Sequence, residues 1–140
     1  MDRVGVFAPE TEAEVRTYYD CVGPAAQTSV REVARAMDFD REEYTERVTS
    51  TVVETARDAI FASLLEVTIG TRDAYDVWRE EYDGEVVEAG HEAVDNVVWH
   101  AGPEDRAVAA TFQNEQEAAV ATLRRQAFGE LYRPIVRDGE

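Results

Sequence analysis

Apolar residues recur at the spacing of an amphipathic helix through the first part of the chain. Val30, Val33, Ala34 and Met37 follow the i, i+3, i+4, i+7 pattern that places side chains on one face of a helix. The same pattern predicts helices over residues 11–22, 24–37, 40–48 and 51–65. Residues 11–65 are therefore predicted to be mainly helical.

The ends of these helices are marked by capping residues. Thr11, Asp40 and Thr51 are each followed three residues later by glutamate, which is the spacing of a capping box. In the helix after Asp40, Tyr44 and Val48 are expected to face inward, as are the apolar residues of the other helices.

The hydrophobic period changes at residue 66. Short runs rich in Val, Ile and aromatic residues predict strands over residues 66–69, 96–100 and 106–112, and a turn signal at Asp83-Gly84 precedes a further short run at 85–88. Thr71 is expected to cap one helix within this region. Residues 66–112 are therefore predicted to be strands with one helix.

A long helix is predicted to close the chain. Asn114 is expected to cap it, and Leu123, Ala127 and Leu131 are expected to face inward. The helix should run over residues 114–135, with its final turn disturbed by Pro134 because proline lacks the backbone N–H.

The order of the elements predicts one α+β domain over residues 1–140. We expect an N-terminal helical segment, then a small, mostly antiparallel sheet of three to four strands, with helices packed on one face. No internal repeat or linker interrupts the pattern.

Acidic residues dominate the charge of the chain. There are 30 of them against 14 basic residues, every one of which is arginine, and the net charge is −16. Acidic chains are often disordered, but a content of 44% hydrophobic residues in a periodic pattern favours a folded core. In molar salt the Debye length falls to about 3 Å, so crowded carboxylates repel one another weakly. The composition therefore predicts a folded protein adapted to high salt.

The number of cysteines and the length of the apolar segments indicate the cellular compartment of the protein. A single cysteine, Cys21, excludes an intrachain disulfide and favours a reducing compartment. The N-terminus lacks the pattern of a signal peptide, and no apolar run approaches the length of a membrane span. We therefore expect a cytoplasmic protein with no membrane partner. Cys21 itself, near the end of an apolar-faced helix, is expected to be a buried and inert thiol.

Several segments carry a family resemblance. FAPETEAE, VREVARAMDFDREEY, ETARDAIFASLL, VVWHAG and TLRRQAFGELYR resemble a family of small acidic proteins from halophilic archaea. The resemblance agrees with salt adaptation. It implies no activity and no catalytic residues, because that family has no assigned function.

Residues 30–48 have the spacing of a helix-turn-helix. The segment that would enter a DNA groove, residues 40–47, carries four acidic residues and two arginines. DNA affinity depends on neutralising phosphates and falls as salt rises, so a high-salt DNA-binding protein should concentrate basic residues there. An ordinary helical corner is the better interpretation, and nucleic acid is not the expected partner.

Candidate metal ligands are few. Only His91, His100 and Cys21 could supply nitrogen or sulfur, and they lack the spacing of a zinc site. His91 is expected to be solvated in a loop. His100 is expected to be a half-buried strand residue with a satisfied hydrogen bond, on the face opposite Trp99. A metal or general-base role for either histidine is the weaker alternative, and no catalytic residue, metal or cofactor is predicted.

The last helix carries a local excess of positive charge. Between residues 120 and 137 there are four arginines and one acidic residue, Glu130. These arginines either pair with acidic residues of the same chain and oppose the helix dipole, or form a contact surface with nearby aromatic residues. The candidate interface residues are Arg124, Arg125, Phe128, Tyr132 and Arg133.

No segment determines a biochemical activity. The favoured hypothesis is a non-catalytic protein–protein interaction module that self-associates, as a homodimer, or binds another protein. A transcription-associated helix-turn-helix protein is the first alternative. An enzyme whose site assembles from scattered residues is the second.

Overall fold

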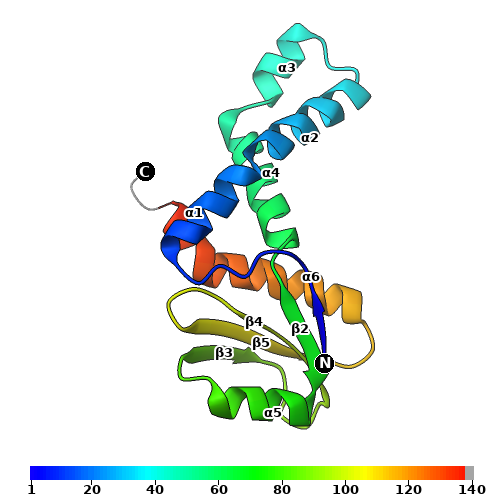
Figure 1. Ribbon diagram of the computed structural model, residues 1–140. Coiled ribbons are helices and arrows are strands. Elements are labelled where there is room, and N and C mark those ends of the chain that lie inside the picture. The colour runs from blue at the N-terminus through cyan, green and yellow to red at the C-terminus, as the bar shows by residue number, and fades with distance from the viewer. Residues whose placement is uncertain (138–140) are drawn as a thin grey trace.

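A five-stranded sheet, the helices that pack against it and a helical arm that projects from it make up residues 1–137, the part of the chain that the computed structural model describes (Figure 1). The strands are β1 (Asp2–Val4), β2 (Val67–Thr71), β3 (Glu85–Ala89), β4 (Asn96–Ala101) and β5 (Arg106–Phe112). The predicted α+β class is confirmed.

The sheet is mixed, with the order β1-β2-β4-β5-β3. All neighbouring strands are antiparallel except β3 and β5, which are parallel. The prediction of three to four strands was too low, because it missed β1. All three residues of β1 are exposed, so this edge strand carries no alternation of buried and exposed positions that a sequence pattern could reveal.

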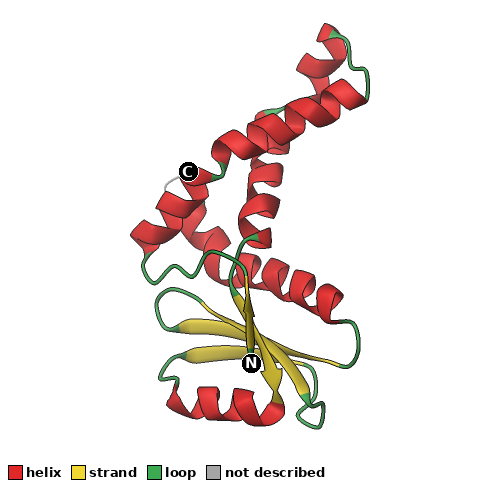
Figure 2. Ribbon diagram, turned by 45° about the vertical axis from the view of Figure 1, so that its right-hand side comes forward, coloured by secondary structure: helices red, strands yellow, loops and turns green. Residues whose placement is uncertain are grey.

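Helices cover both faces of the sheet, where we had expected one. Figure 2 shows α5 (Arg72–Glu81) on one face and α6 (Gln116–Ala127) on the other. In β4, Val97 and Trp99 pack on the α5 side, while Val98 packs in the larger core on the α6 side. Four consecutive buried residues in β4 require cover on both faces.

The N-terminal helices are α1 (Glu12–Cys21), α2 (Gly23–Ala36), α3 (Arg41–Arg47) and α4 (Ser50–Ser63). The predicted caps at Thr11 and Asp40 are confirmed, because the side chain of each accepts a hydrogen bond from the backbone N–H three residues on, over 3.1 and 2.8 Å. Thr49, and not Thr51, caps α4 through the N–H of Val52. Thr71 caps α5 as predicted.

We call residues 23–63, which comprise α2, α3 and α4, the arm. The helices α2 and α4 lie side by side and run in opposite directions, and α3 lies at the tip, far from the sheet (Figure 1). Few residues of the arm are buried. In the described range 27–60, Ala34 is the only residue that is fully buried.

The C-terminal helix is not continuous. It begins at Gln116, without the predicted side-chain cap from Asn114, and a π-helical turn, η1 (Phe128–Tyr132), separates α6 from α7 (Arg133–Val136). Proline cannot donate the hydrogen bond that would close the next α-helical turn. The backbone N–H of Arg133, directly before Pro134, reaches five residues back to the carbonyl of Phe128, which widens the helix locally.

Phe61, near the end of α4, is fully buried at the junction of the arm and the sheet. Its ring lies 5.6 Å from that of Phe7, 5.7 Å from Tyr19, 6.0 Å from Phe128 and 5.3 Å from Tyr132, measured between centroids. Tilted and edge-on arrangements at these distances are favourable for aromatic pairs. One side chain thus joins the N-terminal segment, α1, α4 and η1.

Buried hydrogen bonds beside this cluster link the sheet to η1. His100 is 2% exposed, so it is fully buried where we had expected a half-buried residue. Its Nδ1 lies 2.5 Å from the carbonyl oxygen of Glu66, and its Nε2 lies 2.5 Å from the hydroxyl of Tyr132. A carbonyl can only accept, so Nδ1 carries a proton. Burial lowers the pKa of the imidazole to about 4, so near neutral pH the ring is uncharged and Nε2 accepts from the hydroxyl of Tyr132.

Replacing Phe61 by alanine should lower the free energy of unfolding by about 3–5 kcal/mol, because it removes a fully buried ring and leaves a cavity. Urea denaturation followed by circular dichroism measures this change. Val77→Ala is the control, since Val77 is 60% exposed on α5 and its truncation should change stability by less than about 0.5 kcal/mol. Equal effects of the two changes would contradict the central place of Phe61.

The buried histidine should make stability depend on pH. Between about pH 6.5 and 4 the unfolded chain binds a proton at His100 that the folded chain excludes, so stability should fall as the pH falls through this window. In His100→Gln the free energy of unfolding should change less over that window than in the natural chain. His91→Gln, a change of the exposed histidine, should keep the natural slope. Imidazole proton resonances followed by NMR would contradict the burial argument if His100 titrated near pH 6.5 in the folded protein.

Candidate functional site

Three residues were candidate metal ligands or nucleophiles in the sequence: His91, His100 and Cys21. Within residues 1–137, no group of three or more His, Cys, Asp or Glu side chains could hold a metal ion. His100 uses both ring nitrogens inside the core. Cys21 is exposed, and the expectation of a buried thiol was wrong. Two residues after buried Tyr19, it points about 200° away from the buried face of α1.

The predicted interface on the C-terminal helix is largely occupied within the chain. Arg124 donates hydrogen bonds from Nε to the carbonyl of Leu65 over 2.9 Å and from Nη2 to that of Val4 over 3.1 Å. Phe128 and Tyr132 are buried in the core, so neither ring is available to a partner. Arg125 and Arg133 remain exposed. Self-association through this helix stays a prediction that would rest on those two arginines alone.

Arg133 also has an intramolecular contact. Its guanidinium carbon lies 5.4 Å from the centroid of the Phe128 ring, within the range of a cation–π interaction. Arg137, at the end of the same segment, forms ion pairs with Glu54 at 3.3 Å and with Asp58. Intramolecular pairing with acidic residues, one of the two alternatives from the sequence, is therefore seen at Arg137, while Arg124 binds backbone carbonyls.

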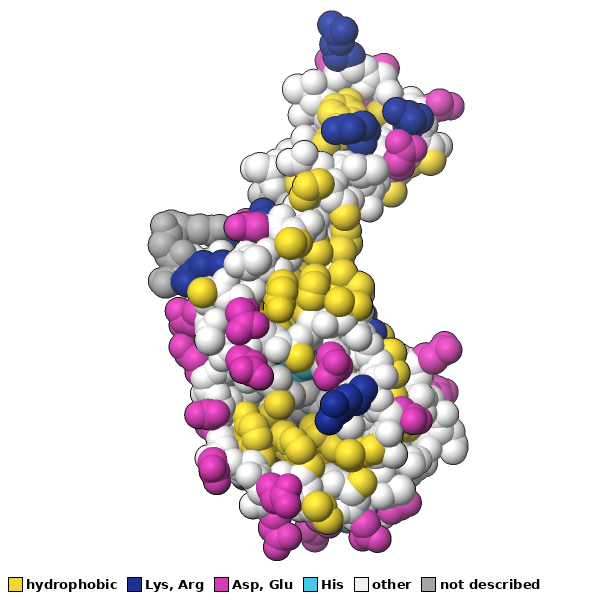
Figure 3. Space-filling model, viewed as in Figure 1, with side chains coloured by type: hydrophobic (Ala, Val, Ile, Leu, Met, Phe, Trp, Pro, Cys, Tyr) yellow, Lys and Arg dark blue, Asp and Glu magenta, His cyan; other side chains and the backbone are white. Residues whose placement is uncertain are grey.

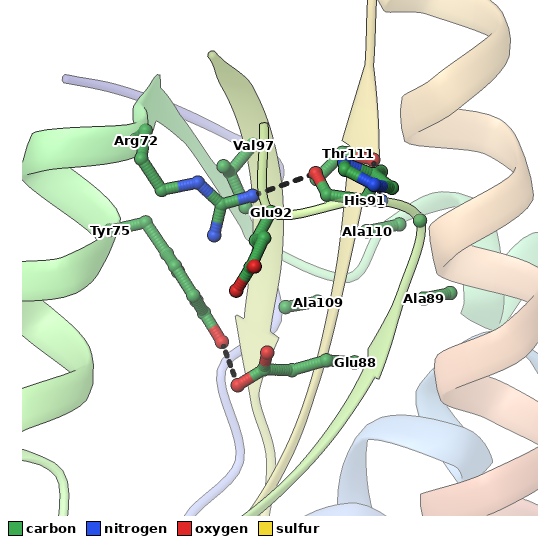
Figure 4. Close-up of a pocket in the computed structure, with 11 residues that line it drawn as sticks. Arg72, Tyr75, Glu88, Ala89, His91, Glu92, Val97, Ala109, Ala110 and Thr111 are labelled. Atoms are coloured by element: carbon green, nitrogen blue, oxygen red, sulfur yellow. Dashed lines mark hydrogen bonds between the residues drawn. The ribbon is translucent and has the colours of Figure 1, made fainter. Parts of the chain in front are cut away.

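A surface pocket of about 410 Å³ lies between α5, β3 and the loop after β3 (Figure 4). Val97 of β4 and Ala109 of β5 form its floor, because both side chains point to the α5 face of the sheet. Since α5 packs on β2 and β4, it leaves this part of the sheet open. The pocket thus results from the position of α5 and from the small side chain at residue 109.

The rim of the pocket is held by the turn after β3. Gly90 has a φ of +102°, and a Cβ there would lie 1.9 Å from the hydroxyl oxygen of Thr111, so only glycine fits. The next residue, His91, donates its backbone N–H to the same oxygen over 3.1 Å. His91 is exposed in this loop, as the sequence predicted, and it lines the pocket.

Charged groups face each other across the pocket. On the α5 side, Arg72 donates hydrogen bonds to the carbonyls of His91 over 3.2 Å and Val94 over 3.3 Å, and it lies 3.9 Å from Asp76. Glu88 provides a carboxylate on the other side, and in this view the carboxylate of Glu92 lies between Arg72 and Glu88 (Figure 4).

The two carboxylates differ in their contacts. Glu88 accepts a hydrogen bond from the hydroxyl of Tyr75 over 2.9 Å and lies 3.6 Å from Arg79. Burial and this hydrogen bond raise the pKa of Tyr75, so its hydroxyl stays protonated and donates. Glu92 is exposed and makes no ion pair with any residue in 1–137, and its carboxylate projects into the space beside Tyr75 (Figure 4).

The arm carries a second concave surface, which we call the arm groove. Its volume is about 500 Å³. Its lining residues are Ser29, Val30, Val33, Ala34, Met37, Phe39, Arg47, Val48, Val52 and Ala56. Eight of these ten are apolar. We had expected this stripe to face inward, and that expectation was wrong for Val33 and Met37, each of which is 58% exposed.

The reason for this exposure is the shape of the arm. Two helices and a short third one have no further layer to cover their apolar side, because the arm extends away from the sheet. Tyr44, also expected inside, is 38% exposed, and α3 contains no buried residue. The space-filling view shows apolar side chains along the arm, interspersed with arginines and carboxylates near its tip (Figure 3).

The helix-turn-helix pattern corresponds to a real corner between α2 and α3. Asp38 has a φ of +56° in the turn, and Asp40 forms a complete capping box with Glu43. The carboxylates of α3 lie at the exposed tip of the arm, with Glu42 and Glu46 both exposed. This surface would repel the phosphates of DNA.

The sequence identified only part of these two surfaces. His91 was named as a weak candidate, but Arg72, Glu88 and Glu92 were not, because each lies among many similar charges in a chain with 30 acidic residues. The residues of the arm groove were recognised as apolar stripes. Whether a stripe is covered depends on what packs against it, which the period cannot show.

The chain was compared with known protein families, curated proteins and solved structures. Residues 6–133 match the model of a family of unknown function, DUF5809. No curated protein and no solved structure matches the chain. No helix within residues 1–137 has the length and apolar content needed to cross a bilayer. The matched range covers most of the 140 residues, so this chain belongs to the family of unknown function DUF5809.

Proposed function

We propose that this protein is a non-catalytic, cytoplasmic interaction module adapted to high salt, and that two copies of the chain associate through their arm grooves. The observation that carries the proposal is the exposed apolar lining of the groove. Val33, Met37 and Val52 are between 42% and 58% exposed on a surface with a single charged lining residue, Arg47. Contiguous apolar surface of this kind marks a site of association.

Charge supports a second copy as the occupant. The arm carries five arginines and eight acidic residues, whereas the rest of the chain carries nine arginines and 22 acidic residues. Two copies that approach through their arms would therefore bring fewer uncompensated carboxylates together than two copies that approach through their sheets, and the difference in repulsion grows as salt is removed. The arm is the part of the molecule that a copy of the same acidic chain can approach at the lowest electrostatic cost.

The packing of α2 against α4 suggests how two copies would associate. In each copy α2 and α4 already lie side by side, and their open face needs a further layer of helices to become a core. A two-fold axis would supply that layer, because it presents the same face of the second copy and makes a four-helix arrangement. At the edge of the groove, Arg47 lies 5.5 Å from the ring of Phe39, which places a cation at the rim, where interfaces are polar.

The alternatives receive less support from the geometry. A DNA-binding protein would need a basic surface at α3, where carboxylates lie instead. An enzyme would need convergent nucleophiles, acids or metal ligands, and those named from the sequence are dispersed or buried within the described residues.

Self-association should be lost when a charge is placed in the arm groove. Light scattering in molar potassium chloride should give the natural chain twice the monomer mass of 15.7 kDa. Val33→Glu should give the monomer mass, because an unpaired carboxylate would be buried at the interface. The matched control is Val77→Glu, a similarly exposed valine on α5, which should stay dimeric.

Two results would contradict the arm groove as the interface. One is a monomeric natural chain at high protein concentration in molar salt. The other is a dimer that persists in Val33→Glu but dissociates in Arg125→Glu, which would place the interface on the C-terminal helix.

Stability should fall as salt is removed. With 22 acidic residues outside the arm, repulsion between carboxylates should grow as the Debye length increases from about 3 Å at 1 M salt to about 30 Å at 0.01 M. The midpoint of thermal unfolding, followed by circular dichroism, should therefore decrease from molar to tens of millimolar potassium chloride. Val33→Glu should show the same trend, which separates this effect from dissociation. An unchanged midpoint would refute salt adaptation.

A further inference from the structure

We infer that the pocket between α5 and β3 binds a small zwitterion, with a carboxylate or similar oxygen group at Arg72, an ammonium group at Glu88 and Glu92, and an aliphatic middle over Val97 and Ala109. This site is separate from the arm groove. It lies at the opposite end of the molecule, where α5 packs on the sheet (Figure 1).

The opposed charges are the first observation. Arg72 uses one terminal nitrogen, Nη2, for the carbonyls of His91 and Val94. Its other terminal nitrogen, Nη1, has only a long contact of 3.9 Å to Asp76. That nitrogen can donate to a ligand oxygen, and a carboxylate is the group that guanidinium binds best.

The acidic side is the second observation. Glu92 makes no ion pair with any described residue, and in Figure 4 its carboxylate points into the pocket between the Arg72 guanidinium and the Tyr75 hydroxyl. Glu88 is 52% exposed, so the carboxylate that already accepts from Tyr75 remains open to a further donor. An ammonium group has three donors and could bind both carboxylates.

The floor and the rim are the third observation. Val97 and Ala109 offer an apolar surface between the charged sides, which suits methylene groups. Gly90, Thr111 and Arg72 hold the loop above it through direct contacts. A rim that is already ordered loses little conformational freedom when a ligand binds.

Net charge distinguishes a zwitterion from simpler ligands. A free anion would meet two carboxylates in the pocket and a chain of net charge −16. A simple cation would suit the carboxylates, but it would offer no acceptor to Nη1 of Arg72 and would face the positive charge of this arginine. A zwitterion can bind Arg72 through its negative group and both glutamates through its positive group. Neither of its charged groups then lies against a side chain of the same charge.

The test uses three probes of equal chain length on the full-length protein. They are ε-aminocaproate, which has both charges, hexylamine, which has only the ammonium group, and hexanoate, which has only the carboxylate. Backbone amide NMR should show saturable shifts for residues of the pocket with ε-aminocaproate, and at least tenfold weaker binding of the other two, because each lacks one charged hydrogen-bonding group.

Two variants locate the site. Glu92→Gln should weaken ε-aminocaproate binding about tenfold, since it removes a charged acceptor. Glu85→Gln, on the same edge strand but outside the pocket lining, should leave it unchanged. Neither side chain is buried, so neither change should unfold the protein.

Several outcomes would overturn the inference. These are no saturable shifts with ε-aminocaproate, equal binding of hexylamine or hexanoate, and equal weakening in Glu92→Gln and Glu85→Gln. Binding should also be unaffected in Val33→Glu, so that failure of the dimer and failure of this site are separate results.

Discussion

Phe61 lies where the arm meets the sheet, and its ring contacts rings from the N-terminal segment, from α1 and from η1. These parts are far apart in the sequence, and the aromatic cluster brings them together. Beside it, His100 links the carbonyl of Glu66 to Tyr132 of η1. The direction in which α4 leaves the sheet, and with it the whole arm, depends on this junction being densely packed.

The junction also divides the molecule into two regions with different surfaces. On one side of the junction, the sheet and its two covering helices contain most of the buried apolar residues and most of the net negative charge. On the other side, the arm contains few buried apolar residues, and its net charge is closer to zero. An apolar surface can remain available for association on an acidic protein only where the local charge is low, and the arm meets that condition.

The two surfaces for which we propose binding differ in chemistry because different secondary structure elements form them. The arm groove is formed by helices that have no covering layer, so its apolar lining is continuous. The pocket beside α5 is formed on a rigid sheet, and its charged groups come from three neighbouring segments that hydrogen-bond to one another. A large apolar surface suits a protein partner, whereas a few placed charges around a small floor suit a small molecule.

The sequence by itself determined the class of the fold, the positions of most helices and strands, and the acidic, lysine-free surface. These features depend on local period, capping and composition, so Thr11, Asp40 and Thr71 could be recognised from their neighbours alone. Tertiary structure decided which apolar stripes are covered, which is why Val33 and Met37 are exposed while Phe128 and Tyr132, named as interface residues, are buried. It also decided that Arg72, Glu88 and Glu92 meet at one pocket. Contacts between distant segments fix both outcomes, and the spacing of residues along one segment carries no information about what packs against it.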